Sequence, residues 1–199
     1  MSRTYIQNEV AAFLRTTDPY GALSNMHAGF SLRVVDLGVP ATENYYQAMR
    51  FPHLPDFQAK ILAEPHPVKA KRLAYTRSNE TRVDWYDVNV SLMRHSLRLR
   101  YGHHPEEMSA LFAKTNGMPI VEISSRDNFW GTLNENGILR GENVLGRLWM
   151  ELRQEVADHD PTTPFEVAAP KISDLILCGR EVATFTPEPV RKAQASFDI

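Results

Sequence analysis

The sequence predicts a single α+β domain, mostly helical, with a small antiparallel sheet. Three observations lead to this fold class. Residues 84–101 carry apolar side chains at every third or fourth position, which is the period of a helix with one buried face. Residues 30–39 and 119–124 are short, contain several β-branched residues and are bounded by turn residues, as strands are. The length of 199 residues is enough for one domain with a substantial core.

The composition is that of an ordinary globular protein, with 43% hydrophobic and 23% charged residues. No apolar run approaches the ~20 residues that cross a bilayer, and the N-terminus lacks the apolar core of a secretion signal. Cys178 is the only cysteine, so we expect no internal disulfide, a cytoplasmic location and no membrane partner. The net charge of −2 means that any contact with DNA needs a local basic patch.

The segments before the first helix are expected to be extended or turns: a strand at 10–14, a turn at 16–21, and a hairpin at 30–39 that turns at 36–38. Pro40 ends the hairpin. Thr42 is the expected N-cap of a helix that begins at Glu43 and ends near Phe51, because Pro52 cannot continue it.

Five further helices are expected along the chain: one capped by Asp56, one at 67–75, one at 84–101, one around Met108 to Phe112, and one from about Asn143. Residues 119–124 are expected to form a strand that Glu122 interrupts, and residues 137–141 a flexible loop. Residues 172–185 are expected to form a hairpin that turns at Gly179 and Arg180. This tail is too short to be a domain, so we predict one domain at 1–157 and an extension at 158–199 that packs on it.

The first helix holds the strongest candidate for chemistry. Glu43 lies in its first turn, where the helix dipole favours an ionised carboxylate, and Gln47 lies four residues on, along the same face. Tyr45, Tyr46 and Met49 surround these two polar residues. A carboxylate and an amide among aromatic rings suit a site that polarises water or holds a sugar hydroxyl. An amphipathic helix whose glutamate only serves the dipole explains the same pattern.

The most basic stretch carries five cations: Lys69, Lys71, Arg72, Arg77 and Arg82. It is interpreted either as a solvated face or as a clamp for phosphate groups, which Arg94 and Arg98 on the next helix would extend. His103 and His104 precede two glutamates, but adjacent residues point apart and no third ligand follows at a recognised spacing. We therefore predict a surface turn there and no metal site.

Several short segments follow one another in an order that is more specific than any one of them. They are residues 20–25, 40–51, 67–72, 82–85, Met93 with Arg94, Glu122 with 127–131, and 141–153. This ordered set resembles the NADAR family (NAD- and ADP-ribose-associated) over residues 13–156. The chain departs from the family at Asn44, where His is usual, and at 23–26, where Leu-Ser-Asn-Met replaces Phe-Ser-Asn-Phe.

Known NADAR members are N-glycosidases, so the resemblance implies cleavage of the bond between ribose C1′ and a nitrogen, through an oxocarbenium-like state. It implies Glu43 as nucleophile or base and Asp127 as the second acidic partner, and the sequence does not divide these roles further. The residues that the resemblance implies for substrate binding are Asn25, Gln47, Lys71, Arg72, Glu122, Trp130 and Asn143. Trp130 would stack on a base or ribose, and Lys71 with Arg72 would hold phosphates. No P-loop, Rossmann or zinc pattern is present, so no cofactor is expected.

The insertion at 52–55 and the tail after Asp158 resemble the branch found beside bacterial DNA ADP-ribosyltransferase toxins. This resemblance implies removal of ADP-ribose from guanine in ADP-ribosylated DNA, with ADP-ribose as product, and an antitoxin role with the cognate toxin as a further partner. Two alternatives stay open. One is hydrolysis of a ribosylamino-pyrimidine phosphate of the riboflavin pathway, and the other is a non-catalytic reader of ADP-ribose or NAD.

Overall fold

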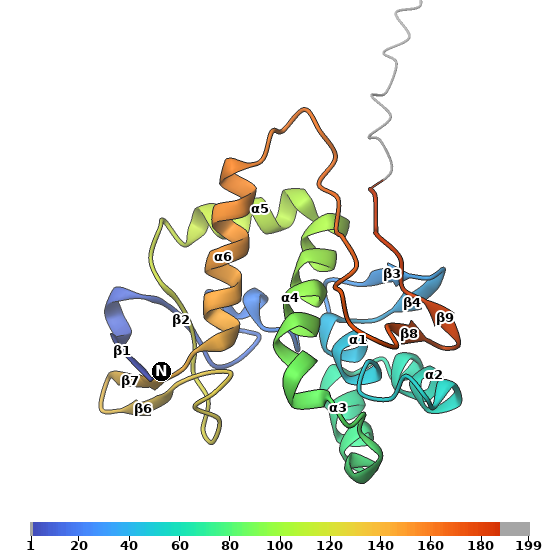
Figure 1. Cartoon of the computed structure of the whole chain (residues 1–199). Coiled ribbons are helices and arrows are strands. Elements are labelled where there is room, and N and C mark those ends of the chain that lie inside the picture. Colours follow the sequence, from blue (N-terminus) through green and yellow to red (C-terminus); the bar gives the residue numbers. More distant parts are fainter. Residues whose placement is uncertain (1, 188–199) are drawn as a thin grey trace, which may run out of the picture.

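The computed structural model describes residues 2–187 and shows an α+β fold, as the sequence predicts (Figure 1). The helices are α1 (Thr42–Ala48), α2 (Pro55–Ala63), α3 (Pro67–Tyr75), α4 (Trp85–His103), α5 (Pro105–Lys114) and α6 (Val144–Asp158). The strands are β1 (Arg3–Ile6), β2 (Ala11–Phe13), β3 (Leu32–Val34), β4 (Leu37–Val39), β5 (Ile120–Glu122), β6 (Leu133–Glu135), β7 (Ile138–Gly141), β8 (Ile176–Leu177) and β9 (Arg180–Glu181).

The strands pair into four small sheets within the described residues. An antiparallel sheet has the order β1-β7-β6, β2 pairs with β5 in parallel, and β3–β4 and β8–β9 are hairpins. The prediction of a flexible loop at 137–141 is wrong, because residues 138–141 form β7, which pairs with β1 on one side and β6 on the other. Asn136 and Gly137 both have positive φ, which is the two-residue turn that joins antiparallel strands.

Four local predictions shift by one or two residues. The N-cap of α1 is Ala41 and not Thr42, and the N-cap of α2 is Leu54 and not Asp56. The two hairpins turn one residue earlier than expected, at Val35 and Asp36 and at Cys178 and Gly179, where the positive φ angles fall.

Helix α4 is the central element of the fold, with α6 on one side and α1 on the other (Figure 1). Its Leu92, Leu97 and Leu99 are buried in the main core, as the period of 84–101 predicts. Arg100 of the same helix is fully buried, and its guanidinium lies 3.8 Å from the centre of the Phe30 ring. It donates hydrogen bonds to the carbonyl oxygens of Ala22 and Ser24. The buried cation therefore holds the loop that carries Asn25.

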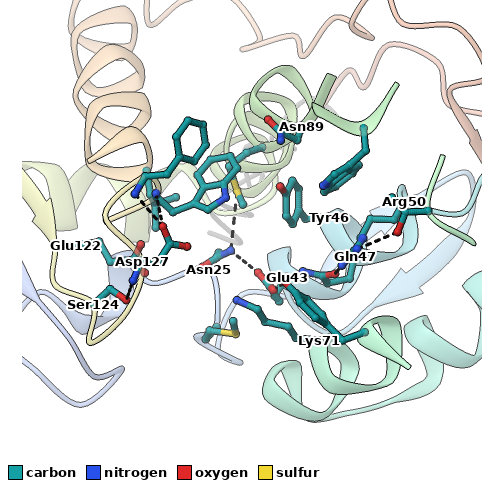
Figure 2. Close-up of a pocket in the computed structure, with 18 of the residues that line it drawn as sticks. Asn25, Glu43, Tyr46, Gln47, Arg50, Lys71, Asn89, Glu122, Ser124 and Asp127 are labelled. Carbon is teal, nitrogen blue, oxygen red and sulfur yellow. Dashed lines mark hydrogen bonds between the residues drawn. The ribbon is translucent and has the colours of Figure 1, made fainter. Parts of the chain in front are cut away.

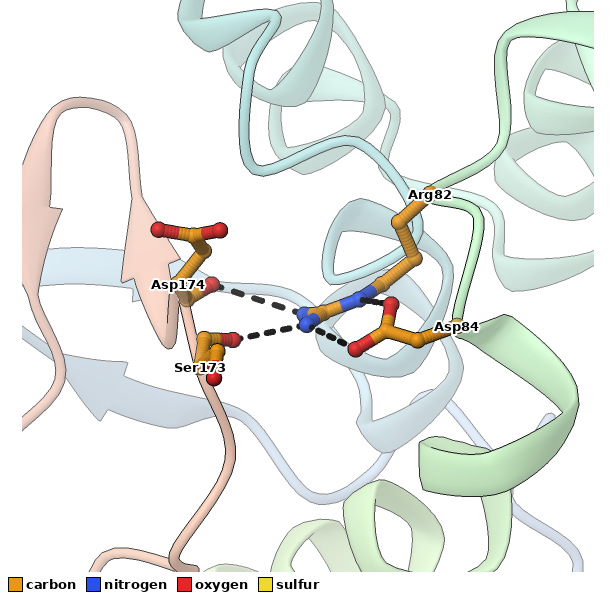
Figure 3. A network of polar contacts seen from close by, with 4 residues as sticks. All are labelled: Arg82, Asp84, Ser173 and Asp174. Carbon is orange, nitrogen blue, oxygen red and sulfur yellow. Dashed lines mark hydrogen bonds and ion pairs between the residues drawn. The ribbon is translucent and has the colours of Figure 1, made fainter.

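The described part of the C-terminal extension lies across the edge of the helical layer. Leu175, Leu177 and Val182 are buried in the main core. Arg82 attaches the extension to the segment before α4, because it donates to the backbone oxygens of Ser173 and Asp174 while it pairs with Asp84 (Figure 3). The division into a domain at 1–157 and an extension at 158–199 stays a prediction, and its residues 188–199 lie outside the described part of the chain.

Candidate active site

A cavity of about 1050 Å³ opens between α1, α3, the start of α4 and residues 122–130 (Figure 2). The loop that carries Asn25 also reaches the cavity, so several separate parts of the chain build its walls. Figure 2 shows Glu43 and Gln47 on one side of the cavity, and Glu122 and Asp127 on the other. The structure thus brings together carboxylates that are up to 84 positions apart in the sequence.

Glu43 lies in the first turn of α1 with only 2% of its surface exposed. Both of its carboxylate oxygens accept hydrogen bonds: Oε2 from Asn25 Nδ2, and Oε1 from Gln47 Nε2 at 2.8 Å. The spacing of Glu43 and Gln47 by one helical turn places both on the face predicted from the sequence. Two amides therefore hold this carboxylate in one orientation.

The network continues from Gln47 to a buried arginine. Gln47 Oε1 accepts from Arg50 Nη1 at 3.1 Å, and Arg50 Nη2 donates to Thr81 Oγ1 at 2.9 Å. The guanidinium also lies over the rings of Tyr75, at 4.8 Å, and Trp85, at 5.3 Å. Such a cation, held by hydrogen bonds and aromatic faces, keeps its orientation when a ligand enters.

Opposing influences act on the protonation of Glu43. Burial raises the pKa of this carboxyl group, because desolvation disfavours its charged form. The charge of Lys71, the hydrogen bond from Gln47 and the charge of Arg50 all lower the pKa again. Lys71 lines the cavity and makes no ion pair within residues 2–187. Burial is the largest of these influences, so the pKa of Glu43 is raised overall, while Lys71 and Arg50 supply counter-charges for its ionised form.

The carboxyl group of Glu122 lacks the hydrogen bonds that hold Glu43. It is the last residue of β5, and its side chain accepts no hydrogen bond from residues 2–187. Burial raises its pKa to about 7, and the negative charges of Glu43 and Asp127 contribute to this rise while Lys71 opposes it. A carboxyl group with this pKa holds a proton in about half of the molecules at neutral pH. Glu122 can therefore donate a proton near neutral pH.

Asp127 lines the cavity and also builds the turn in which it lies. Its Oδ1 accepts the backbone N–H groups of Phe129 and Trp130, each at 2.9 Å, and its own N–H donates to Ser124 Oγ. One carboxylate oxygen is thus committed to the shape of the turn. This turn positions Trp130 in the wall of the cavity.

Aromatic side chains form the rest of the wall. The ring centre of Tyr46 lies 5.1 Å from that of Trp85 and 5.7 Å from that of Trp130. Further out, Tyr86 is 89% exposed and Tyr75 56% exposed, and Phe129 also lies at the surface. The cavity therefore has a polar inner part and an aromatic rim.

Two of the nine predicted site residues do not reach the cavity. Arg72 lies next to Lys71 on α3 but points outward, because successive helical residues face directions about 100° apart. Asn143 is completely buried, with its Oδ1 accepting from the Glu122 N–H and its Nδ2 donating to the Ile120 oxygen. Its side chain supports β5. The other seven, Asn25, Glu43, Gln47, Lys71, Glu122, Asp127 and Trp130, all line the cavity.

The structure does not assemble the broad basic clamp that the sequence suggested. Four of its arginines are paired with acidic side chains: Arg77 with Glu80, Arg82 with Asp84, Arg94 with Glu151, and Arg98 with Glu155. The cations that line the inner cavity are Lys71 and Arg50. Their positive charge is local and close to the carboxylates.

Sequence reasoning missed Arg50 and Asn89, which both line the cavity. Arg50 follows Gln47 by three residues within the motif already singled out, so helical spacing contained the signal. Asn89 stands one turn before Met93 in a helix interpreted only as core, and it is the polar position on that face. Among residues 2–187, no group of three or more potential metal ligands occurs, and no helix is long and apolar enough to cross a membrane.

Comparisons with known proteins place this fold and this cavity in a family. Residues 12–157 match the NADAR domain, and the chain belongs to the NADAR family. It is 33% identical over 152 residues to the N-glycosidase YbiA of Escherichia coli, a match that covers 76% of this chain and 91% of that protein. The solved NMR structure of E. coli YbiA superimposes with a TM-score of 0.65 at 31% identity, over 78% of this chain and 92% of that one.

A second kind of relative is longer than this chain. A riboflavin biosynthesis protein of Vibrio vulnificus is 31% identical over 159 residues, which are 80% of this chain and 42% of that protein. The family match ends at residue 157, so the C-terminal extension lies outside it.

Proposed function

We propose that this chain is an N-glycosidase that removes ADP-ribose from guanine in DNA and thereby reverses the action of a DNA ADP-ribosyltransferase toxin. N-glycosidase chemistry is the general part of this function, and it is supported by membership of the NADAR family and by the named activity of YbiA. The observation that carries the proposal is the pair Glu43 and Glu122, two carboxyl groups that line one cavity. Burial raises the pKa of both groups, and only Glu43 is held by two amide donors.

In the proposed mechanism the ribose lies between the two carboxyl groups. Glu43, held by Asn25 and Gln47, stabilises the positive charge that develops at C1′, and either attacks this carbon or takes a proton from the water that does. Glu122 donates its proton to the departing guanine nitrogen. The negative charge of Asp127 adds to the stabilisation of the oxocarbenium-like state.

Two features favour a large nucleotide substrate. The cavity of about 1050 Å³ stands at the upper end of small-molecule sites. The exposed rings of Tyr75, Tyr86 and Phe129 at its rim suit stacking with bases, which contributes about 1–3 kcal/mol per base. Lys71 and Arg50 supply two cations for a diphosphate. Because Arg77, Arg82, Arg94 and Arg98 are paired with acidic side chains, recognition of DNA in this proposal relies on the aromatic rim more than on charge.

A ribosylamino-pyrimidine phosphate is the second candidate substrate. It is favoured by the similarity to riboflavin biosynthesis proteins and by the small number of unpaired cations in the cavity. A non-catalytic reader of ADP-ribose or NAD is disfavoured, because three carboxyl groups in the site would repel the phosphates of a ligand that is only bound. The cognate toxin as a partner and a cytoplasmic location remain part of the proposal through the resemblance to toxin-associated members.

The test is a direct comparison of substrates. The purified protein is incubated with an oligonucleotide that carries ADP-ribosylated guanine, and with the ribosylamino-pyrimidine phosphate, and released products are separated by chromatography. We expect ADP-ribose from the oligonucleotide, and none when Glu43 is replaced by Gln. Efficient turnover of the pyrimidine phosphate with none of the oligonucleotide would assign the chain to the second candidate.

A further inference from the structure

Asn89 is a buried amide that no part of the fold uses. It lies in α4, lines the cavity and is only 6% exposed. Its Oδ1 has no hydrogen-bond partner, and its Nδ2 makes no hydrogen bond to residues 2–187 either. A buried polar group without a partner destabilises a fold by about 1–3 kcal/mol. Its presence in the wall of a cavity points to a ligand as the missing partner.

The position of Asn89 along α4 shows which part of a ligand it meets. Three turns of this helix face the cavity: Tyr86 at the exposed rim, Asn89 behind it, and Met93 at the inner end. Met93 Sδ lies 4.0 Å from Asn25 Nδ2, the same group that donates to Glu43. The helical rise places Asn89 about 6 Å from Met93 along the axis, toward the rim. A ligand group that hydrogen-bonds to Asn89 therefore lies closer to the rim of the cavity than the carbon that faces Glu43.

The chemistry of the surroundings favours a nucleobase at this position. Asn89 lines the same cavity as Tyr46, whose ring packs against those of Trp85 and Trp130 (Figure 2). An amide next to aromatic rings suits a flat heterocycle, because it offers one donor and one acceptor in a plane. A phosphate would need a cation, and Lys71 lies on the other side of Tyr46 from Asn89 in the same view.

We infer that Asn89 is a specificity-determining residue that hydrogen-bonds the edge of the nucleobase released by cleavage. This inference rests on the proposed function, because it assigns the base of the same substrate. Rotation of the amide about χ2 presents either its donor or its acceptor to the base. In this arrangement, Glu122 protonates the departing nitrogen and Asn89 decides which base occupies the site.

The test uses three variants of Asn89 and one control. Asn89→Leu removes the amide at similar volume, Asn89→Asp removes the donor, and Asn89→Gln restores an amide. Ser96→Ala is the matched control, because Ser96 is a buried polar residue of the same helix whose hydroxyl bonds to the Leu92 oxygen and which does not line the cavity. Substrates are oligonucleotides with ADP-ribosylated guanine or with its O6-methyl and 7-deaza analogues.

We expect the unmodified protein to distinguish guanine from at least one analogue by about tenfold or more in kcat/KM, as the loss of a hydrogen bond to a buried polar group does. Asn89→Leu should lose this discrimination through KM with little change of kcat, and Asn89→Gln should recover part of it. The thermal midpoint of Asn89→Leu should be equal to or above that of the unmodified protein, since no internal bond is removed. Ser96→Ala should keep the discrimination.

Discrimination that survives unchanged in Asn89→Leu overturns the inference, and so does a lowered thermal midpoint without a change in KM. The proposed function fails separately, if no guanine substrate is cleaved in a manner that depends on Glu43. In that case binding of guanosine, measured by calorimetry, decides the inference: equal affinity for the unmodified protein and for Asn89→Leu overturns it, and at least tenfold weaker binding by the variant supports it.

Discussion

The two sides of the cavity hold their carboxyl groups in different ways. On the α1 side, both oxygens of Glu43 are hydrogen-bonded, and a chain of contacts continues through Gln47 and Arg50 to Thr81. On the β5 side, the carboxyl group of Glu122 has no hydrogen-bond partner among residues 2–187, and burial raises its pKa to about 7. Burial raises the pKa of both groups, but the Glu43 carboxyl group is held in one orientation by two amides and that of Glu122 is not. This difference separates the expected roles of the two residues.

Replacement of Glu43 should have the largest effect. Glu43→Gln keeps the size of the side chain and removes the charge that would stabilise the oxocarbenium-like state. We expect kcat to fall by about 10³-fold or more, because base or nucleophile and electrostatic contributions are lost together. The measurement is single-turnover release of ADP-ribose, with binding of ADP-ribose as the control for folding. A variant within tenfold of the unmodified kcat would remove Glu43 from the mechanism.

Replacement of Glu122 should change the pH profile as well as the rate. The proton donor must be protonated, so the rate of the unmodified protein should decrease as pH rises through about 7. Glu122→Gln should lower kcat about 10²-fold at pH 6 and remove this alkaline decrease. Rates measured from pH 5 to 9 check both points. An alkaline limb that persists in the variant would assign the proton donor elsewhere.

The same residue makes a prediction about stability. The pKa of Glu122 is about 7 in the folded state against an ordinary value of 4.5, so the folded state binds this proton more tightly than the unfolded state. The contribution to stability is therefore fully present below pH 4.5 and is lost as pH rises through 7. Glu122→Gln removes this loss. The thermal midpoint of the variant, relative to that of the unmodified protein, should be higher at pH 8 than at pH 5.

Replacement of Lys71 should have a smaller effect, mainly on binding. Lys71 lines the cavity and Lys69, two residues earlier on α3, does not. We expect Lys71→Met to raise KM about tenfold, as the loss of one charge-assisted hydrogen bond does, and Lys69→Met to leave it unchanged. Steady-state kinetics of the two variants separate a site cation from general surface charge. Equal effects of both would favour the solvated-face interpretation of this helix.

Replacement of Asp127 tests whether its charge or its turn is needed. Asp127→Asn keeps an oxygen that can accept from the N–H groups of Phe129 and Trp130, and we expect a loss of less than about tenfold. Asp127→Ala removes this acceptor and should cost more, because Trp130 loses its position. Comparison of the two kcat values gives the answer. An equal and large decrease of kcat in both variants would show that the charge of Asp127 is needed for catalysis as much as that of Glu43.

Much of the fold was accessible from local patterns. The period of 84–101 and of the segment after Asn143 predicted α4 and α6, since one buried face per helix produces that spacing directly. The strand at 138–141 was missed because residues 137–141 were interpreted as a flexible loop. The residues of 40–51 predicted the face of α1 that the cavity uses, and the ordered motifs of the family predicted part of the cavity's polar lining.

What the sequence determined by itself is the set of residues that share a helix face or a turn, because the backbone period places them together whatever the rest of the chain does. Only the tertiary structure decided which arginines stay unpaired and which backbone groups Asn143 binds. It also decided that Asn89 Oδ1 lacks a hydrogen-bond partner. Several of these contacts join residues far apart in the sequence, since Arg94 and Glu151 are 57 positions apart, and Arg82 and the carbonyl of Ser173 are 91 apart. The pKa of Glu122 belongs to the same class, since desolvation and the charge of Glu43 exist only once β5 and α1 face one cavity.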